Sequence, residues 1–350
     1  MRQLADIFGH EQLHLFRDPA TGLTGVVAIH STALGPAMGG LRLRRYRDIE
    51  AAAVDAMRLA RAMTLKNSAA GLSLGGGKAV LLDDGEWHDR EARLLAFADV
   101  VEQLDGRYIT AEDIGTTTED MDVLATRTEW VVGRSRAGGG LDDPSPATAH
   151  TVFAAIEAGV RHALGVDSLR GMRVGVLGAG KVGAPLIALL GEAGAELTVA
   201  DVDPARAVAA VAAAGGRGAV VGLEGFVTRD LDVLSPCAVG EVIALQDVAS
   251  LRCRVVAGAA NNPLVDDATA VAVHERGILY VPDFIANCGG IIQVAGEHEG
   301  LAPEAIAAQQ EAAIARIEEL LEEAEAHGAM PRAVAVERAL QRVALSAARA

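Results

Sequence analysis

Residues 173–203 constrain the fold more than any other part of the chain. A short apolar run at 174–177 is followed by Gly178, Gly180 and Gly183 at the spacing G-x-G-x-x-G. The first glycine permits a sharp turn, the second lets backbone approach a bound group, and the third lets a helix pack closely on the strand. A glycine triplet alone is a weak signal. Here a strand precedes it and a helix follows it, so the segment predicts a βαβ unit of a parallel sheet.

The same segment predicts a dinucleotide site. Lys181 and Val182 open a helix over 181–193, whose N-terminal amides and dipole favour a pyrophosphate. A second strand at 197–200 ends in Asp201, roughly twenty residues after the glycines, where an acid hydrogen-bonds ribose hydroxyls. Its charge repels a 2′-phosphate, so the sequence favours NAD over NADP. A glycine-rich turn in some other α/β unit is the alternative, and it fits this context less well.

Composition limits the remaining choices. A chain of 350 residues predicts two domains. Its net charge of −16 argues against nucleic acid and anionic membranes as partners. Residues 1–10 are too polar for a signal peptide and charged or glycine residues interrupt the apolar stretches, so a cytoplasmic protein without a membrane span is expected. Three cysteines fit a reducing compartment, and no metal-ligand spacing is present.

Strand and helix patterns alternate along the rest of the chain. The N-terminal part predicts strands at 13–16, 24–30 and 108–114 and helices at 49–63 and 91–104. After the glycine segment, further short strands that extend a doubly wound sheet are expected at 219–221, 233–234, 255–257 and 278–281. A glycine- and proline-rich linker near residues 138–146 separates the two parts. The predicted divisions are 1–140, 141–328 and a C-terminal helix at 329–350 that packs back on the first domain.

Two lysines of the first domain have surroundings that suit chemistry. Lys78 follows three glycines and begins an apolar strand, where desolvation lowers the pKa of an amine and suits it to be a general base. An ordinary surface lysine at a strand start is an equally good reading. Lys66, just past a helix end, can stay charged and bind a substrate carboxylate, and Asp113, at a strand end, is the candidate acid partner. Gly39 and Gly40 offer backbone amides that can point at an anion.

Seven segments resemble the amino-acid dehydrogenase family of glutamate, leucine, valine and phenylalanine dehydrogenases, nearest the leucine, valine and phenylalanine branch. They occur in collinear order over residues 23–297: PAMGGLR, MTLKNSAAGLSLGGGKAV, YITAEDIGTTTEDMD, DDPSPATAHTVF, GVLGAGKVG, VVAGAANNPL and VPDFIANCGGIIQVAGE. The resemblance implies an N-terminal α/β substrate-binding and oligomerisation domain, a Rossmann NAD-binding domain, and a homo-oligomer. It also implies reversible oxidative deamination of an L-amino acid to a 2-oxo acid and ammonia.

The resemblance implies roles for particular residues. Lys66, helped by the Gly39 and Gly40 amides, would bind the substrate carboxylate. Lys78 would be the catalytic lysine, and Asp113 would exchange protons with the amino group. Further contacts to substrate and NAD would come from Asn261 at the carboxylate and nicotinamide ribose, Thr148 at the carboxamide, and Pro236, Cys237 and Ala238 at the adenosine half. Cys288 is interpreted as a packing residue.

The resemblance also bears on the substrate. Glutamate-specific relatives place a lysine where this chain has Met38, which leaves a glutamate side chain unpaired. Phenylalanine-specific relatives tend to have glycine where this chain has Ala111, and Ile291 adds branched bulk. The sequence therefore favours valine and leucine, with phenylalanine as the alternative because Leu41 replaces a threonine that many relatives carry. A catalytically inactive dinucleotide sensor is a remote alternative, because such a protein would have lost Lys66, Lys78 or Asp113.

Overall fold

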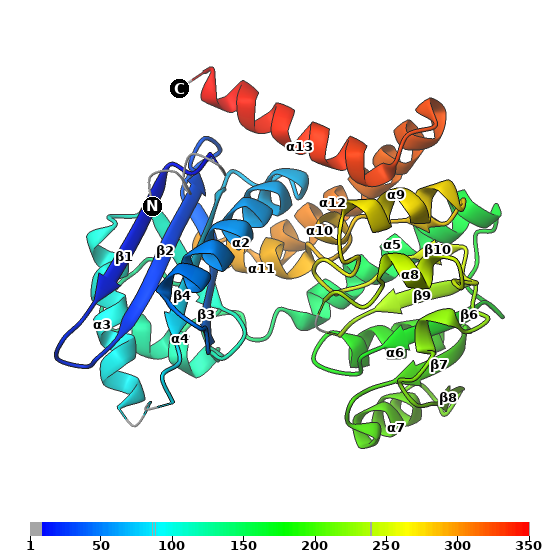
Figure 1. Ribbon diagram of the computed structural model, residues 1–350, viewed down its shortest axis with the longest axis horizontal. Helices are drawn as coiled ribbons and strands as arrows, with labels where there is room; N and C mark the ends of the chain where they lie inside the picture. Colours follow the sequence, from blue (N-terminus) through cyan, green and yellow to red (C-terminus); the bar gives the residue numbers. More distant parts are fainter. Residues whose placement is uncertain (1–8, 86, 88, 239, 350) are drawn as a thin grey trace. The chain divides into compact units, whose positions relative to one another are not determined.

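The computed structural model describes residues 9–85, 87, 89–238 and 240–349. Most of the segment used to judge the signal peptide therefore lies outside the described residues. The chain divides into two compact units, labelled along the ribbon in Figure 1. Unit 1 comprises Met1–Pro144, Ile291–Ile306 and Arg338–Ala350, and unit 2 comprises Ser145–Gly290 and Ala307–Glu337. The predicted two-domain α/β fold is confirmed.

The unit boundaries differ from the predicted divisions in one important segment. Ile291–Ile306, expected in the second domain, belongs to unit 1. Side chains of this segment explain the difference, because Gln293 donates to the carbonyl oxygen of Leu141 at 3.3 Å and Glu297 accepts from the Leu141 amide at 3.2 Å. Residues Arg338–Ala350 also belong to unit 1, where Ser68 donates to the carbonyl oxygen of Ala339 at 2.8 Å.

Unit 1 is built on a mixed five-stranded sheet in the order β1-β2-β4-β3-β5. The strands β4, β3 and β5 run parallel to one another, and β2 pairs antiparallel with both β1 and β4. Their bounds are β1 Gln12–Arg17, β2 Thr24–Ser31, β3 Ala37–Arg44, β4 Gly75–Leu82 and β5 Tyr108–Glu112. The sequence analysis did not predict β3, whose two central glycines suggested only exposed backbone amides.

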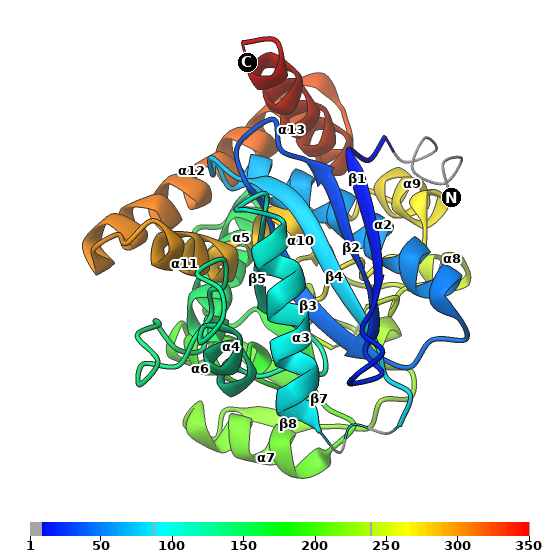
Figure 2. The same ribbon diagram turned by 90° about the vertical axis from the view of Figure 1, so that its left-hand side faces the viewer.

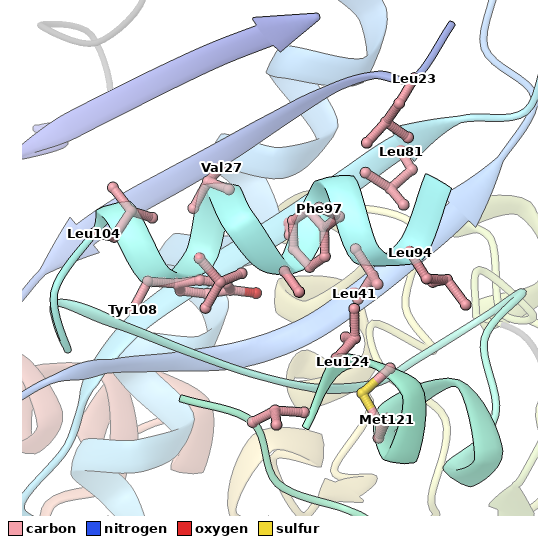
Figure 3. Packing of buried hydrophobic residues seen from close by; sticks show 14 of the residues in the cluster. Leu23, Val27, Leu41, Leu81, Leu94, Phe97, Leu104, Tyr108, Met121 and Leu124 are labelled. Atoms are coloured by element: carbon pink, nitrogen blue, oxygen red, sulfur yellow. The ribbon is translucent and has the colours of Figure 1, made fainter. Parts of the chain in front are cut away.

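Two helices, α2 (Ile49–Ala69) and α3 (Arg90–Gln103), cover the two faces of this sheet. Side chains of a strand alternate between faces. Val80 packs with the small residues of α2, whereas Leu81 packs against Phe97 of α3. Figure 2 shows α3 running across the sheet, and Figure 3 shows Phe97 and Leu94 packed against strand residues and against the short helix α4 (Thr118–Leu124). The face toward α2 is the one that carries the candidate site.

Unit 2 is a six-stranded parallel sheet in the order β11-β10-β9-β6-β7-β8. This is the doubly wound order, in which the first strand of the unit lies at the centre and the chain winds outward on both sides. The strands are β6 Arg173–Leu177, β7 Glu196–Ala200, β8 Gly218–Val220, β9 Val233–Pro236, β10 Val255–Val256 and β11 Leu279–Tyr280. The predicted Rossmann sheet is thus confirmed.

The remaining elements of unit 2 are mostly helices that connect these strands. They are α5 Ser145–Leu164, α6 Gly183–Glu192, α7 Pro204–Ala213, the 3₁₀ helix η1 Phe226–Thr228, α8 Leu245–Val248, α9 Asp267–Glu275 and α10 Asp283–Ala286. Three more helices follow, and each has residues in both units: α11 Gly289–His298, α12 Pro303–His327 and α13 Pro331–Ala347. Among the described residues, no helix is both long and apolar enough to cross a membrane.

Candidate active site

Lys78 and Asp113 form a buried ion pair in unit 1. The Lys78 ammonium lies 2.9 Å from Oδ2 of Asp113, and Nε of Arg42 lies 2.8 Å from the same oxygen. Lys78 is only 5% exposed, so the alternative of a surface lysine is wrong. Lys78 does not begin the strand as predicted, because the three glycines before it belong to β4 and place Lys78 in the middle of that strand. We call Arg42, Lys78 and Asp113 the acid–base cluster.

Gly40 is the reason that the ion pair can form. It lies on β3, the strand between β4 and β5, and is paired with Ala111 of β5. A Cβ at position 40 would lie 2.8 Å from Cβ of Asp113 and 3.2 Å from Nζ of Lys78. The two charged side chains therefore meet over a residue that has no side chain of its own. The sequence analysis assigned Gly40 only an amide, and the structure adds this steric role.

Burial and charge act in opposite directions on the pair. Burial lowers the pKa of Lys78 below its ordinary value, although the Asp113 carboxylate partly opposes this effect. Burial alone would raise the pKa of Asp113, but the charges of Lys78 and Arg42 outweigh it and hold that pKa at about 2. Asp113 is therefore ionised at neutral pH, and Lys78 loses its proton more readily than an ordinary lysine. An amine of this kind suits a general base at neutral to alkaline pH.

The sequence suggested that Lys66 lies just past a helix end. The structure places it in the last turn of α2. The helix continues to Ala69, and Gly71, with φ of 80°, turns the chain after it. The neighbouring Asn67 is buried and donates to the carbonyl oxygen of Gly75 at 2.5 Å. A Cβ at Gly76 would lie 2.1 Å from Oγ1 of Thr64. The glycines of β4 thus let α2 pack closely on the strand that carries Lys78.

The expected substrate-pocket residues also belong to unit 1. Met38 of β3 is fully buried, and Ala111 of β5 is 8% exposed. Both lie on one face, because Met38 precedes Gly40 by two residues on its strand and Gly40 pairs with Ala111. Ile291 lies near the start of α11 and is half-buried.

Val294 also lies close to Ala111 and was not named from the sequence. A Cβ at Gly133 would lie 3.9 Å from Cγ1 of Val294 and 4.0 Å from Cβ of Ala111. Gly133 therefore brings the helix of Ile291 and the strand of Ala111 within van der Waals reach of one point. The sequence could have indicated Val294, because it follows Ile291 by three residues and residues three apart lie on the same side of a helix.

The glycines of unit 2 fit a dinucleotide. Gly178 has φ of 105°, and a Cβ there would lie 2.7 Å from the amide of Ala238. A Cβ at Gly183 would lie 2.0 Å from the carbonyl oxygen of Gly178, so the helix α6 begins tightly against the turn. A Cβ at Gly180, in contrast, would meet no described atom within 4 Å. The turn is thus close-packed at the first and third glycines and open at the second, where a pyrophosphate approaches the backbone.

Asp201 follows β7 directly, at the position expected for a ribose ligand. Its Oδ2 accepts from the amide of Ala179 at 2.7 Å, and its Oδ1 accepts from the amide of Asp203 at 2.8 Å. These bonds fix the carboxylate beside the glycine turn. Lys181 and Val182 precede α6, which begins at Gly183 and not at residue 181.

The other expected cofactor residues also lie in unit 2. Thr148 is in the first turn of α5, and Pro236, Cys237 and Ala238 lie at or just after the end of β9. Oδ1 of Asn261 accepts a hydrogen bond from the side-chain amide, Nδ2, of Asn287 at 3.0 Å. Cys288 is fully buried, consistent with packing. Within the described ranges, no group of three histidine, cysteine or acidic side chains could hold a metal ion.

Two family models match the chain. The model of the Glu/Leu/Phe/Val dehydrogenase dimerisation domain matches residues 10–130. The model of the Glutamate/Leucine/Phenylalanine/Valine dehydrogenase domain matches residues 203–349. Together they cover most of the chain, including the acid–base cluster in the first match and Asn261 in the second.

Full-length relatives agree with these models. The leucine dehydrogenase of Bacillus subtilis (strain 168) is 42% identical over 90% of this chain and 86% of its own length. The valine dehydrogenase of Streptomyces virginiae is 45% identical over 85% of this chain and 83% of its own. The crystal structure of L-tryptophan dehydrogenase from Nostoc punctiforme superposes with a TM-score of 0.85 at 33% identity, covering 100% of both chains. The chain is therefore an oxidoreductase of the glutamate, leucine, phenylalanine and valine dehydrogenase family, as its sequence motifs indicated.

Proposed function

We propose that this protein is an NAD-dependent dehydrogenase that oxidatively deaminates apolar L-amino acids, with valine and leucine preferred. The observation that carries the proposal is the buried ion pair of Lys78 and Asp113. It combines an amine that loses its proton readily with a carboxylate that stays ionised. The glycine turn with Asp201 supplies a place for the dinucleotide. An assay of reduced-nicotinamide absorbance with amino acid and NAD tests the activity, and no turnover with any amino acid would favour the sensor alternative.

The proposed reaction divides the work among the residues of unit 1. NAD, held by the glycine turn and Asp201, would supply the acceptor for the hydride of the substrate α-carbon, and loss of that hydride leaves an iminium on the substrate. Lys66 binds the substrate carboxylate, and the ionised Asp113 accepts a hydrogen bond from the substrate amino group, which reacts in its neutral form after losing a proton to solvent, and stabilises the iminium charge. Neutral Lys78 removes a proton from the water that attacks the iminium carbon and gives it to the departing amine. Lys78 then takes the hydroxyl proton as the carbonyl forms and releases it to solvent. The sum is amino acid, NAD⁺ and water giving 2-oxo acid, ammonium, NADH and one proton.

Asp201 is expected to give a preference for NAD over NADP of at least about tenfold in kcat/KM, a difference of about 1.4 kcal/mol. The reason is that its fixed carboxylate would face a 2′-phosphate. Steady-state kinetics with both cofactors measure the ratio. The Asp201→Ser variant should lower this ratio, mainly by weakening the binding of NAD. Equal efficiency with NADP in the unchanged protein would contradict the role given to Asp201.

The substrate preference is expected to follow the volume beside Ala111. Valine and leucine should exceed phenylalanine and tryptophan in kcat/KM, because methyl-sized differences in a pocket are worth about 1–3 kcal/mol. Ala111→Gly should raise the ratio of kcat/KM for phenylalanine to kcat/KM for leucine about tenfold. Ala79→Gly is the matched control, because Ala79 is buried against α3 on the opposite face of the sheet and should change stability without changing the ratio.

An aromatic substrate is the second candidate. The full-length likeness to an L-tryptophan dehydrogenase favours it. Leu41, in contrast, packs in the cluster on the α3 face, opposite the candidate site, so this departure from the threonine of many relatives does not bear on the pocket. A kcat/KM for phenylalanine or tryptophan about tenfold above that for leucine, or about 1.4 kcal/mol, would establish this alternative. It would also show that Ala111 and Ile291 do not set the pocket.

The protein is also proposed to act as a homo-oligomer. The support is that residues 10–130 match a family model described as a dimerisation domain.

A further inference from the structure

Arg42 is the member of the acid–base cluster to which no role was assigned from the sequence. It lies on β3 two residues after Gly40, and its side chain is 11% exposed. Its Nε lies 2.8 Å from Oδ2 of Asp113, and its Nη1 lies 3.2 Å from Oδ2 of Asp55 on α2. One guanidinium thus joins the residue that follows β5 to the helix that covers the sheet. A rigid planar fork suits this task better than a flexible ammonium does.

We propose that Arg42 is a positioning residue for the reaction: it holds the Asp113 carboxylate in place against Lys78 and shares its charge with that pair. This inference rests on the proposed function. Both Arg42 and Lys78 bind the same oxygen, Oδ2. Among the residues that the structure describes, none donates a hydrogen bond to the other oxygen, Oδ1. The arrangement fixes the carboxylate plane and leaves Oδ1 for the substrate ammonium.

The far end of the arginine is itself held. Oδ2 of Asp55 also accepts from the Tyr46 hydroxyl at 2.6 Å, and Oδ1 of Asp55 accepts from Arg58 at 3.0 Å. The pKa of Asp55 is lowered even though burial acts in the opposite sense, because its hydrogen bonds and the two arginine charges outweigh burial. Asp55 is therefore a charged, fixed anchor. Arg42 cannot rotate away from Asp113 without giving up a second charged partner.

The charges around Lys78 give Arg42 a measurable signature. Burial is the main cause that lowers the Lys78 pKa, Asp113 and more weakly Asp55 raise it, and Arg42 lowers it further. Removing Arg42 should therefore raise the pKa of Lys78. Deamination needs neutral Lys78, so the rate of deamination should begin to increase at a higher pH in a variant without Arg42. Removing the charge of Asp55 should lower the Lys78 pKa and move this increase to lower pH. Removing a residue that only supports the fold would change neither the Lys78 pKa nor the pH of the increase.

The experiment compares pH profiles of kcat for deamination in four variants. Arg42→Met should lower kcat about 10²-fold, as misplacement of a reacting group does. It should also raise the midpoint of the profile by about one pH unit. Arg42→Lys keeps the charge and should restore the midpoint but only part of kcat. Asp55→Asn should lower kcat and shift the midpoint slightly down. Arg58→Met is the matched control with an unchanged profile, because Arg58 is 51% exposed and binds Asp55 without contacting Asp113.

Urea unfolding shows whether each variant is folded, because NADH binding would report only on the other unit. If Arg42→Met does not fold, Asp55→Asn decides: its midpoint should move down while that of Arg42→Lys stays at the value of the unchanged protein, and an unshifted midpoint in Asp55→Asn overturns the inference. A folded Arg42→Met with an unshifted midpoint, or an Arg58→Met variant with the same shift, overturns the inference.

A second measurement separates this inference from the proposed function. The rate at which acetic anhydride acetylates Lys78, followed by peptide mass spectrometry over a pH series, reports the Lys78 pKa without turnover. An inactive protein in which Arg42→Met shifts this titration upward would support the inference and refute the function. An active protein in which Arg42→Met leaves both titration and profile unchanged would do the reverse.

Discussion

Replacement of Lys78 by methionine is expected to lower kcat for amino-acid deamination by about 10³-fold, within the range that a general base contributes. Methionine has a similar length and cannot take a proton from water. Asp113 would keep its bond to Arg42, and the methionine side chain would occupy the buried space of the lysine inside β4. The fold should therefore persist. Because the glycine turn and Asp201 belong to the other unit, NADH affinity should be nearly unchanged. Stopped-flow measurement of hydride transfer and equilibrium NADH binding test these two expectations.

The pH dependence sharpens the same prediction. In the unchanged protein, deamination should increase with pH as Lys78 loses its proton, with a midpoint below that of an ordinary lysine, because burial lowers the Lys78 pKa. The increase due to this group should be absent in Lys78→Met. Arg45→Met is a suitable control, because Arg45 is a 76% exposed cation that pairs with Asp83 away from the cluster. Near-normal turnover by Lys78→Met would show that the ion pair is structural.

Unit 2 was largely predictable from sequence because its signals are local. The glycine turn, the strand before it and Asp201 after it lie within thirty-one residues, and each has one structural requirement. The apolar runs of unit 2 gave most of the strand positions for the same reason. Only details at element ends differ, such as the start of α6 at Gly183 and not at residue 181.

Unit 1 was harder to predict because its glycines carry a tertiary meaning. The glycines at 39–40 suggested only exposed amides, and those at 75–77 were placed before a strand, yet they lie inside β3 and β4. Glycine is usually unfavourable in a strand. Here it is required by neighbours distant in sequence: a Cβ at Gly77 would lie 2.7 Å from the ring of Tyr108. Such requirements cannot be read from local periodicity.

The role of Arg42 could not be predicted for a related reason. Its partners Asp113 and Asp55 lie 71 and 13 residues away, and only the parallel pairing of β3 with β5 brings the first of them near. The short stretch LRLRRY offers three similar arginines. Arg42 and Arg44 lie on the same face of β3, and Arg45 lies beyond the end of the strand. Only Arg42, two positions after Gly40, bonds both carboxylates. The position along the strand decides between them, and the strand itself was not predicted.

Replacement of Gly40 by alanine is expected to separate Lys78 from Asp113 and to lower kcat by about 10²-fold, the effect of displacing reacting groups by about 1 Å. The added methyl group would lie 2.8 Å from Cβ of Asp113 and 2.8 Å from the carbonyl oxygen of Glu112, both closer than such atoms approach. The carbonyl belongs to the backbone of β5 and moves little, so the side chains of the pair must yield.

Overpacking also destabilises a sheet, by about 1–3 kcal/mol, and activity loss must be separated from this general effect. Gly25→Ala is the matched variant. A Cβ at Gly25 would lie 2.5 Å from Phe16 and 2.8 Å from the carbonyl oxygen of Val80, in the same sheet but without contact to the acid–base cluster. Both variants should lose similar stability in urea unfolding, whereas only Gly40→Ala should lose kcat. If Gly25→Ala is equally impaired in turnover, the glycine over which Lys78 and Asp113 meet serves the packing of the sheet and not the ion pair.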